Sequence, residues 1–142
     1  METADVRKRV KDALERVKRQ HAERRARNAQ ASAAFEVFLQ RSAVPVFQQV
    51  AGALKAEGYL YVVNTPAGSV QLVSEKSGSD FIDLRLDTGS GRAQVVLRVE
   101  RARGREHLSE ERPLKPGALV ENLTEQDVLD AVIEAIETLI DR

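Results

Sequence analysis

The sequence contains no cysteine, only two histidines and no long apolar run. Without cysteine the chain can form neither disulfides nor thiolate metal sites. Its strongly apolar stretches are only a few residues long, far short of the roughly 20 that a bilayer-spanning helix needs. The amino terminus lacks the apolar stretch of a signal peptide. These absences predict a cytoplasmic protein with no membrane span.

Charge is balanced over the whole chain but divided unevenly along it. The 142 residues include 22 Lys and Arg and 22 Asp and Glu, a formal net charge of zero. Residues 1–28 carry ten cations against five anions, whereas residues 121–142 carry seven anions against one cation. A basic beginning and an acidic end favour a protein that holds partners over one that performs chemistry.

Proline and glycine are absent from Asp5 to Arg41, which predicts one continuous helix about 55 Å long. Its heptad-like positions follow alternating steps of four and three, with a polar middle, as in a coiled-coil seam. We therefore predict a homodimer that associates through the apolar seam residues Val10, Leu14, Val17, Phe35 and Phe38. The alternative is a helix that packs on its own domain at the Phe35 and Phe38 end, with a solvated basic half.

Residues 1–44 are thus interpreted as a charged helical arm and residues 45–142 as a compact domain. We expect Val44-Pro45 to break the helix, because the residue before proline is disfavoured in helical conformation. A short second helix should follow and end at Gly58 in a Schellman cap. The domain should continue as an antiparallel meander with strands near residues 59–64, 69–75, 80–87, 92–101 and 105–112.

The last element predicted is a helix from about 125 to 141, with Thr124 as its N-cap and an acidic outer face that includes Asp141. It should lie on the dry side of the sheet, so the fold class is α+β. The fifth strand is too polar for the centre of a sheet and should form an edge. Two strands, however, have apolar residues on both faces, and some surface should cover part of the second face.

No set of residues predicts a catalytic, metal or cofactor site. His21 and His107 have no partner at ligand spacing. Gly89-Ser90-Gly91 precedes a strand and not a helix, which is typical of a hairpin turn and not of a phosphate loop. Asp80, Asp83 and Asp87 could hold a hard cation, but Arg85 lies between two of them and opposes it. We expect a non-enzymatic protein.

Nucleic-acid or polyanion binding is the alternative function. The candidate residues are the ten cations of the first 28 residues: Arg7, Lys8, Arg9, Lys11, Arg16, Lys18, Arg19, Arg24, Arg25 and Arg27. Against this hypothesis, acids are interspersed among them, no aromatic residue is available to stack a base, and the whole chain is neutral.

A third hypothesis is a ligand-binding cup between the sheet and a helix. Tyr59 and Tyr61 would form its wall. A tyrosine pair on a strand more commonly packs under a helix with its hydroxyls at the rim, so the core interpretation is favoured.

Overall fold

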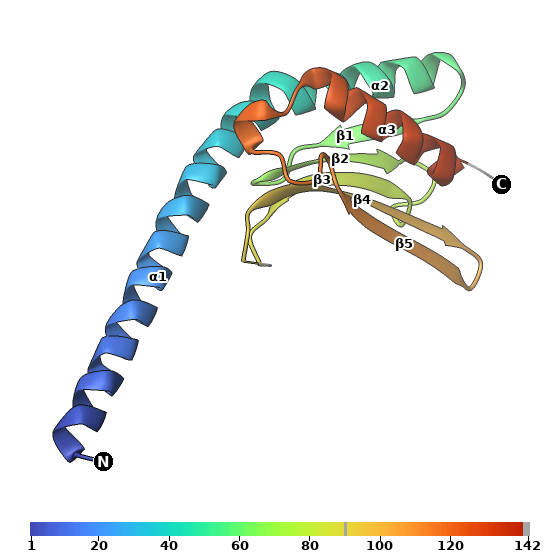
Figure 1. Cartoon of the computed structure of the whole chain (residues 1–142). Coiled ribbons are helices and arrows are strands. Elements are labelled where there is room, and N and C mark those ends of the chain that lie inside the picture. Colours follow the sequence, from blue (N-terminus) through green and yellow to red (C-terminus); the bar gives the residue numbers. More distant parts are fainter. Residues whose placement is uncertain (90, 141–142) are drawn as a thin grey trace.

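The computed structural model describes residues 1–89 and 91–140, and confirms the α+β fold (Figure 1). Ser90 and Asp141, to which the sequence assigned a turn and an outer acid, lie outside the described residues. The helical elements are α1 (Thr3–Phe38), a π-helical turn η1 (Leu39–Ala43), α2 (Val44–Ala56), a 3-10 turn η2 (Val120–Asn122) and α3 (Glu125–Ile140). The strands are β1 (Tyr61–Asn64), β2 (Ser69–Ser74), β3 (Phe81–Asp87), β4 (Gln94–Arg103) and β5 (Glu106–Pro113).

The predicted second helix does begin at Val44, but the predicted break in the helical backbone there is wrong, because the backbone stays helical through this point. Val44 has φ −59° and ψ −48°, and its N–H donates to the carbonyl of Leu39, five residues earlier. Proline normally interrupts a helix because it lacks an N–H and its ring collides with the carbonyl four residues before it. The wider π turn immediately before Pro45 changes that hydrogen-bonding pattern, so the chain remains helical while its direction changes between α1 and α2 (Figure 1).

The end of α2 has the predicted Schellman geometry. The Tyr59 N–H donates to the Leu54 carbonyl at 2.8 Å, and the Gly58 N–H donates to the Lys55 carbonyl at 3.0 Å. Gly58 has φ +89°, a conformation that glycine adopts without the steric cost of a side chain. This cap ends α2 and turns the chain directly into the sheet.

The five strands form an antiparallel sheet in sequence order, β1-β2-β3-β4-β5, so β5 is an edge strand as predicted. Both α2 and α3 lie on the same face of the sheet (Figure 1). The core lies between these layers and is formed by alternate residues of the central strands together with the inner faces of both helices. Its fully buried members include Phe47, Leu72, Ile82, Leu84, Leu97 and Val132.

The start of α3 is a reciprocal capping box. The Asp127 N–H donates to the Thr124 hydroxyl oxygen at 3.1 Å, and the Thr124 N–H donates to the Asp127 carboxylate at 2.9 Å. Two backbone donors that the helix leaves unpaired are satisfied in this way. The predicted N-cap is confirmed.

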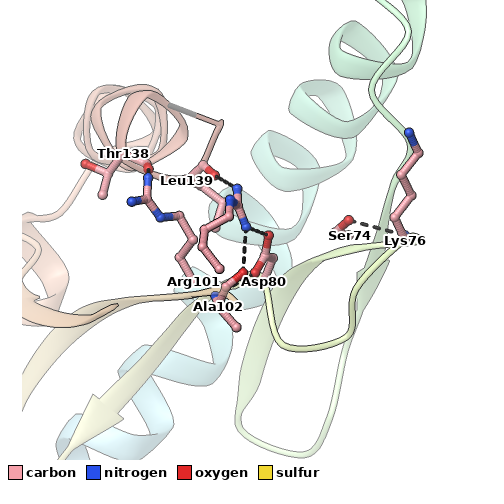
Figure 2. Close-up of polar contacts among 8 residues, drawn as sticks. Ser74, Lys76, Asp80, Arg101, Ala102, Thr138 and Leu139 are labelled. Atoms are coloured by element: carbon pink, nitrogen blue, oxygen red, sulfur yellow. Dashed lines mark hydrogen bonds and ion pairs between the residues drawn. The ribbon is translucent and has the colours of Figure 1, made fainter. Parts of the chain in front are cut away.

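The other end of α3 is held by two arginines of β4 (Figure 2). Arg101 donates to the Thr138 carbonyl at 2.9 Å, and Arg103 donates to the Leu139 carbonyl at 3.0 Å. Asp80, which is buried before β3, accepts hydrogen bonds from the Arg103 guanidinium and from the Ala102 N–H. Cations at a helix C-terminus interact favourably with its dipole and its free carbonyls. These hydrogen bonds, which we call the α3 latch, join the residue before β3 to β4 and β4 to the end of α3. The Asp80 carboxylate is therefore already hydrogen-bonded within the fold.

Candidate interaction surface

The most exposed part of the molecule is the amino-terminal portion of α1, which leads away from the sheet and its two covering helices (Figure 1). We define the arm as residues 3–27. Within it every residue is exposed except Ala13, which is half-buried by its helical neighbours. The helix enters the domain only further along, where Phe35 and Phe38 are buried. The arm therefore begins as a helix that the rest of the chain leaves bare.

Four large apolar side chains gather on one side of this arm. Val10 and Leu14 are 52% and 56% exposed, and Val6 and Val17 are similarly bare. Because each residue turns the helix by 100°, these four positions fall within an arc of about 80°. We call this set, Val6, Val10, Leu14 and Val17, the arm strip.

Charge is arranged around the arm strip in an orderly way. The four acids of the arm, Asp5, Asp12, Glu15 and Glu23, all lie at least about 130° from the middle of the strip. The cations lie closer to the strip: Arg7, Lys18 and Arg25 are within about 90° of its middle on one side and Arg24 is at its other edge, while Lys11, Arg9, Arg16 and Arg27 are about 100–120° from its middle. Lys8 and Arg19 lie opposite the strip, among the acids. The acids are thus absent from the strip side of the helix, but each still has cations as helical neighbours, as Glu15 has Lys11 and Lys18.

The two phenylalanines of the predicted seam are placed differently from the three aliphatic residues. Phe35 and Phe38 are 3% and 7% exposed and pack in the core of their own chain, with ring centroids 6.4 Å apart. They are not available at the surface in this conformation. Val10, Leu14 and Val17 are available, so the prediction of self-association now concerns these three residues and Val6.

No family model, curated protein or solved structure matches this chain. Its candidate sites are therefore argued from its own geometry. None of the helices in residues 1–89 and 91–140 combines the length and apolar character needed to cross a bilayer.

The sheet face opposite the helices carries a second notable group, centred on Glu100 of β4. The Glu100 carboxylate accepts a hydrogen bond from the Ser109 hydroxyl at 2.6 Å, and its other oxygen lies 2.6 Å from His107 Nε2. The Ser109 hydrogen bond is the largest cause that holds the pKa of Glu100 below its ordinary value, with His107 adding to it. Because the serine donates to the carboxylate and not to the histidine, this arrangement fixes β5 to β4 and does not activate a nucleophile.

A neighbouring acid on the same face, Asp83, is buried beside two arginines. Burial raises the pKa of Asp83, against the lowering effects of a hydrogen bond from Gln71 and of the charges on Arg98 and Arg85. The Arg98 guanidinium also lies 5.2 Å from the centre of the Phe81 ring. In the part of the chain that the structure describes, no three His, Asp or Glu side chains are grouped as they would be around a metal ion.

Sequence analysis missed the Glu100 group because its members come from two strands. His107 has no partner at ligand spacing in the sequence, but strand register places Ser109 directly opposite Glu100. The signal that could have found the group is the charge alternation of two adjacent predicted strands, once their pairing is known. This face also carries apolar residues: Val96 is only 3% exposed, with Arg85 and Pro113 as its register partners, and Val62 of β1, which pairs with Val73, is 39% exposed.

The two tyrosines proposed as a ligand wall lie in different surroundings. Tyr61 is half-buried in β1 and packs against the hydrophobic core, where burial raises the pKa of its hydroxyl. Tyr59 precedes β1, is exposed, and forms part of the cap of α2. The structure therefore does not bring the two side chains into one buried wall.

Proposed function

We propose that this chain is a non-enzymatic interaction protein that self-associates through the arm strip of α1. The observation that carries the proposal is a row of four exposed aliphatic side chains on a helix that residues 1–89 and 91–140 leave uncovered. Removing one such side chain from water contributes on the order of 1.5–3 kcal/mol. A second copy of the chain that buried the strip would therefore gain substantially.

The position of the strip supports this interpretation. Residues 18–30 of α1 contain no large aliphatic or aromatic side chain, whereas four fall between Val6 and Val17. The helix thus has a separate apolar group at the end remote from the core, divided by a polar middle from Phe35 and Phe38, which pack in the core. An amphipathic helix that served only to pack on its own domain would have its apolar side chains near that domain.

The test is the mass of the particle in solution. Light scattering or sedimentation at micromolar concentration should give two chains per particle for the natural sequence, and one for the double variant Val10→Glu with Leu14→Glu. A matched control is Val37→Glu, because Val37 is also 52% exposed but lies on the opposite side of α1. The control should keep the two-chain mass; a natural chain that runs as one chain would remove the proposal.

A second candidate function, polyanion binding, is favoured by the density of exposed cations on the arm. All ten are exposed, and four of them (Arg7, Lys18, Arg24 and Arg25) lie within about 90° of the middle of the strip, where the arm has no acid. Such a surface could neutralise phosphates. Fluorescence anisotropy with single-stranded and duplex RNA and DNA would test it: affinity should fall steeply with salt and be lost when residues 1–28 are deleted. Absence of binding at low salt would exclude it.

A further inference from the structure

A second apolar row lies on α3, beside the residues that face the sheet core, and one of its members, Ile136, packs partly against that core. Ile133 is 47% exposed and Leu129 is also exposed, while Ile136 and Ile140 are half-buried beside them. These four positions span an arc of about 60°, because they recur at helical spacing. We call Leu129, Ile133, Ile136 and Ile140 the α3 flank.

The arm and the α3 flank match in spacing. Residues 129, 133, 136 and 140 repeat as i, i+4, i+7 and i+11, and so do Val6, Val10, Ala13 and Val17, with Leu14 beside them. Each row is about 16 Å long at 1.5 Å per residue. Two helices with apolar rows of equal length can pack their ridges together over the whole row.

The two rows are bordered by opposite charge. α3 contains five acids and no basic residue, and Asp130 and Glu137 lie immediately outside its flank. Glu134 lies about 40° beyond Asp130, further from the flank, and accepts a hydrogen bond from Arg112 at 2.8 Å. The arm strip is bordered by cations on both sides, so either packing direction brings a cation to Asp130 and Glu137. Opposed charges of this kind select and orient a partner.

Two arms are a poorer match for each other. In a two-stranded coil the seam residues would include Arg7 and Arg24. The flanking positions would be Lys11, Lys18 and Arg25 on one side and Val6, Ala13 and Gln20 on the other. No acid is available there to form an interhelical ion pair. Arm-to-arm packing would thus bring cations together without compensation.

We propose that the arm strip of one copy packs on the α3 flank of a second copy, in a dimer whose two arms are exchanged. The inference rests on the proposed self-association and specifies its contact. Within one chain this contact cannot form, because α1 is continuous from Thr3 to Phe38 and leads away from α3 (Figure 1). When both copies exchange their arms, the same contact forms twice in a two-fold symmetric dimer, and no arm or flank is left free to add a third copy.

Complementation between two variants tests the exchange. The arm variant Val10→Glu with Leu14→Glu and the flank variant Ile133→Lys should each run as one chain by light scattering. Mixed in equal amounts, they should form mixed dimers, because the intact arm of the flank variant can still bind the intact flank of the arm variant. Leu119→Lys, at a 62% exposed position outside the α3 flank and the arm strip, is the control and should remain dimeric.

Each alternative occupant gives a different result. If the flank variant remains dimeric while the arm variant is monomeric, the contact is arm-to-arm or arm-to-sheet; the proposed exchange is then overturned and self-association stands. If the natural chain is monomeric, both proposals fall. Circular dichroism of each variant should show an unchanged melting curve under conditions where all are monomeric, since the substituted side chains are exposed.

Charge reversal provides an independent measurement. Lys11→Glu with Lys18→Glu should weaken association by about tenfold, since each exposed ion pair contributes up to about 1 kcal/mol. Asp130→Lys with Glu137→Lys should weaken it similarly. Mixing the two reversed chains should restore attraction at both contacts, because the reversed arm then meets the reversed flank and the natural arm meets the natural flank. If the two reversed chains associate with each other no more tightly than each associates with itself, these four charges do not face one another in one contact, and the proposed pairing is overturned.

Discussion

The two ends of α1 follow one apolar pattern but lie in opposite surroundings. Leu14 and Phe35 are separated by three heptads of the same seam, yet Leu14 is 56% exposed and Phe35 is 3% exposed. The carboxyl-terminal end packs in the core cluster and contacts η1 and η2, whereas the side chains of the arm from Thr3 to Ala26 stay exposed, except for half-buried Ala13, among the residues that the structure describes. The comparison teaches that seam spacing identifies the side of a helix that will be covered, but not the surface that covers it.

The largest expected effect is on the free energy of unfolding, which should respond very differently to truncation at the two ends of α1. Phe35→Ala should destabilise the domain by about 3–5 kcal/mol, because it removes a large side chain from a packed core. Leu14→Ala should change the stability of the dilute monomer by no more than about 0.5 kcal/mol. Urea unfolding followed by circular dichroism measures both. Equal losses for the two variants would mean that the arm is not bare in solution.

A smaller loss should follow from opening the latch at the far end of α3. Asp80→Ala removes the acceptor of the Ala102 N–H and the partner of Arg103, which should cost about 1–3 kcal/mol. Glu75→Ala, at an exposed acid nearby, is the control and should be nearly neutral. The comparison of midpoints in urea decides whether Asp80 has the structural role assigned to it.

Acid should weaken the domain partly through Glu100. Its pKa is lowered in the folded state, so its stabilisation is present above the pKa of the unfolded chain and is lost as the pH falls through the folded value. Glu100→Gln should therefore be less stable than the natural chain at pH 7, and the difference should shrink in acid. Thermal melts across this range measure the effect.

Asp83 on the same sheet face is the opposite case, because burial raises its pKa. Ionisation of Asp83 disfavours the folded state as the pH rises, so the natural chain loses this part of its stability on going from acid to pH 7. Asp83→Asn should remove this decrease in stability between acid and pH 7. Glu100→Gln should instead remove the increase in stability that Glu100 provides over the same range. Melts in which both substitutions changed the pH dependence in the same direction would contradict these assignments.

The smallest effect is expected from removing the arm. Deletion of residues 1–27 should leave the unfolding midpoint of the dilute domain within about 0.5 kcal/mol, because these residues form no contact with the core. The same deletion should abolish self-association. A domain that unfolds on losing the arm would show that the two regions are not independent.

Much of the fold was predictable because its signals are local. The absence of proline and glycine predicted α1, alternation and turn residues predicted five strands, and Thr124 with Asp127 predicted the start of α3. The helix break at Val44-Pro45 was predicted wrongly, since a π turn keeps the backbone helical there. For the candidate site, the sequence revealed the apolar row on the arm but not its isolation from the core.

By itself, then, the sequence determined where helices and strands lie and which side of α1 is apolar, because these properties depend on neighbours within a few residues. Only the tertiary structure decided that Phe35 is buried while Val10 is bare, and that Glu100 and Asp80 bind partners from other elements. Burial and these hydrogen bonds depend on residues that are distant in the chain. Only the packing of the sheet against the helices brings those residues together.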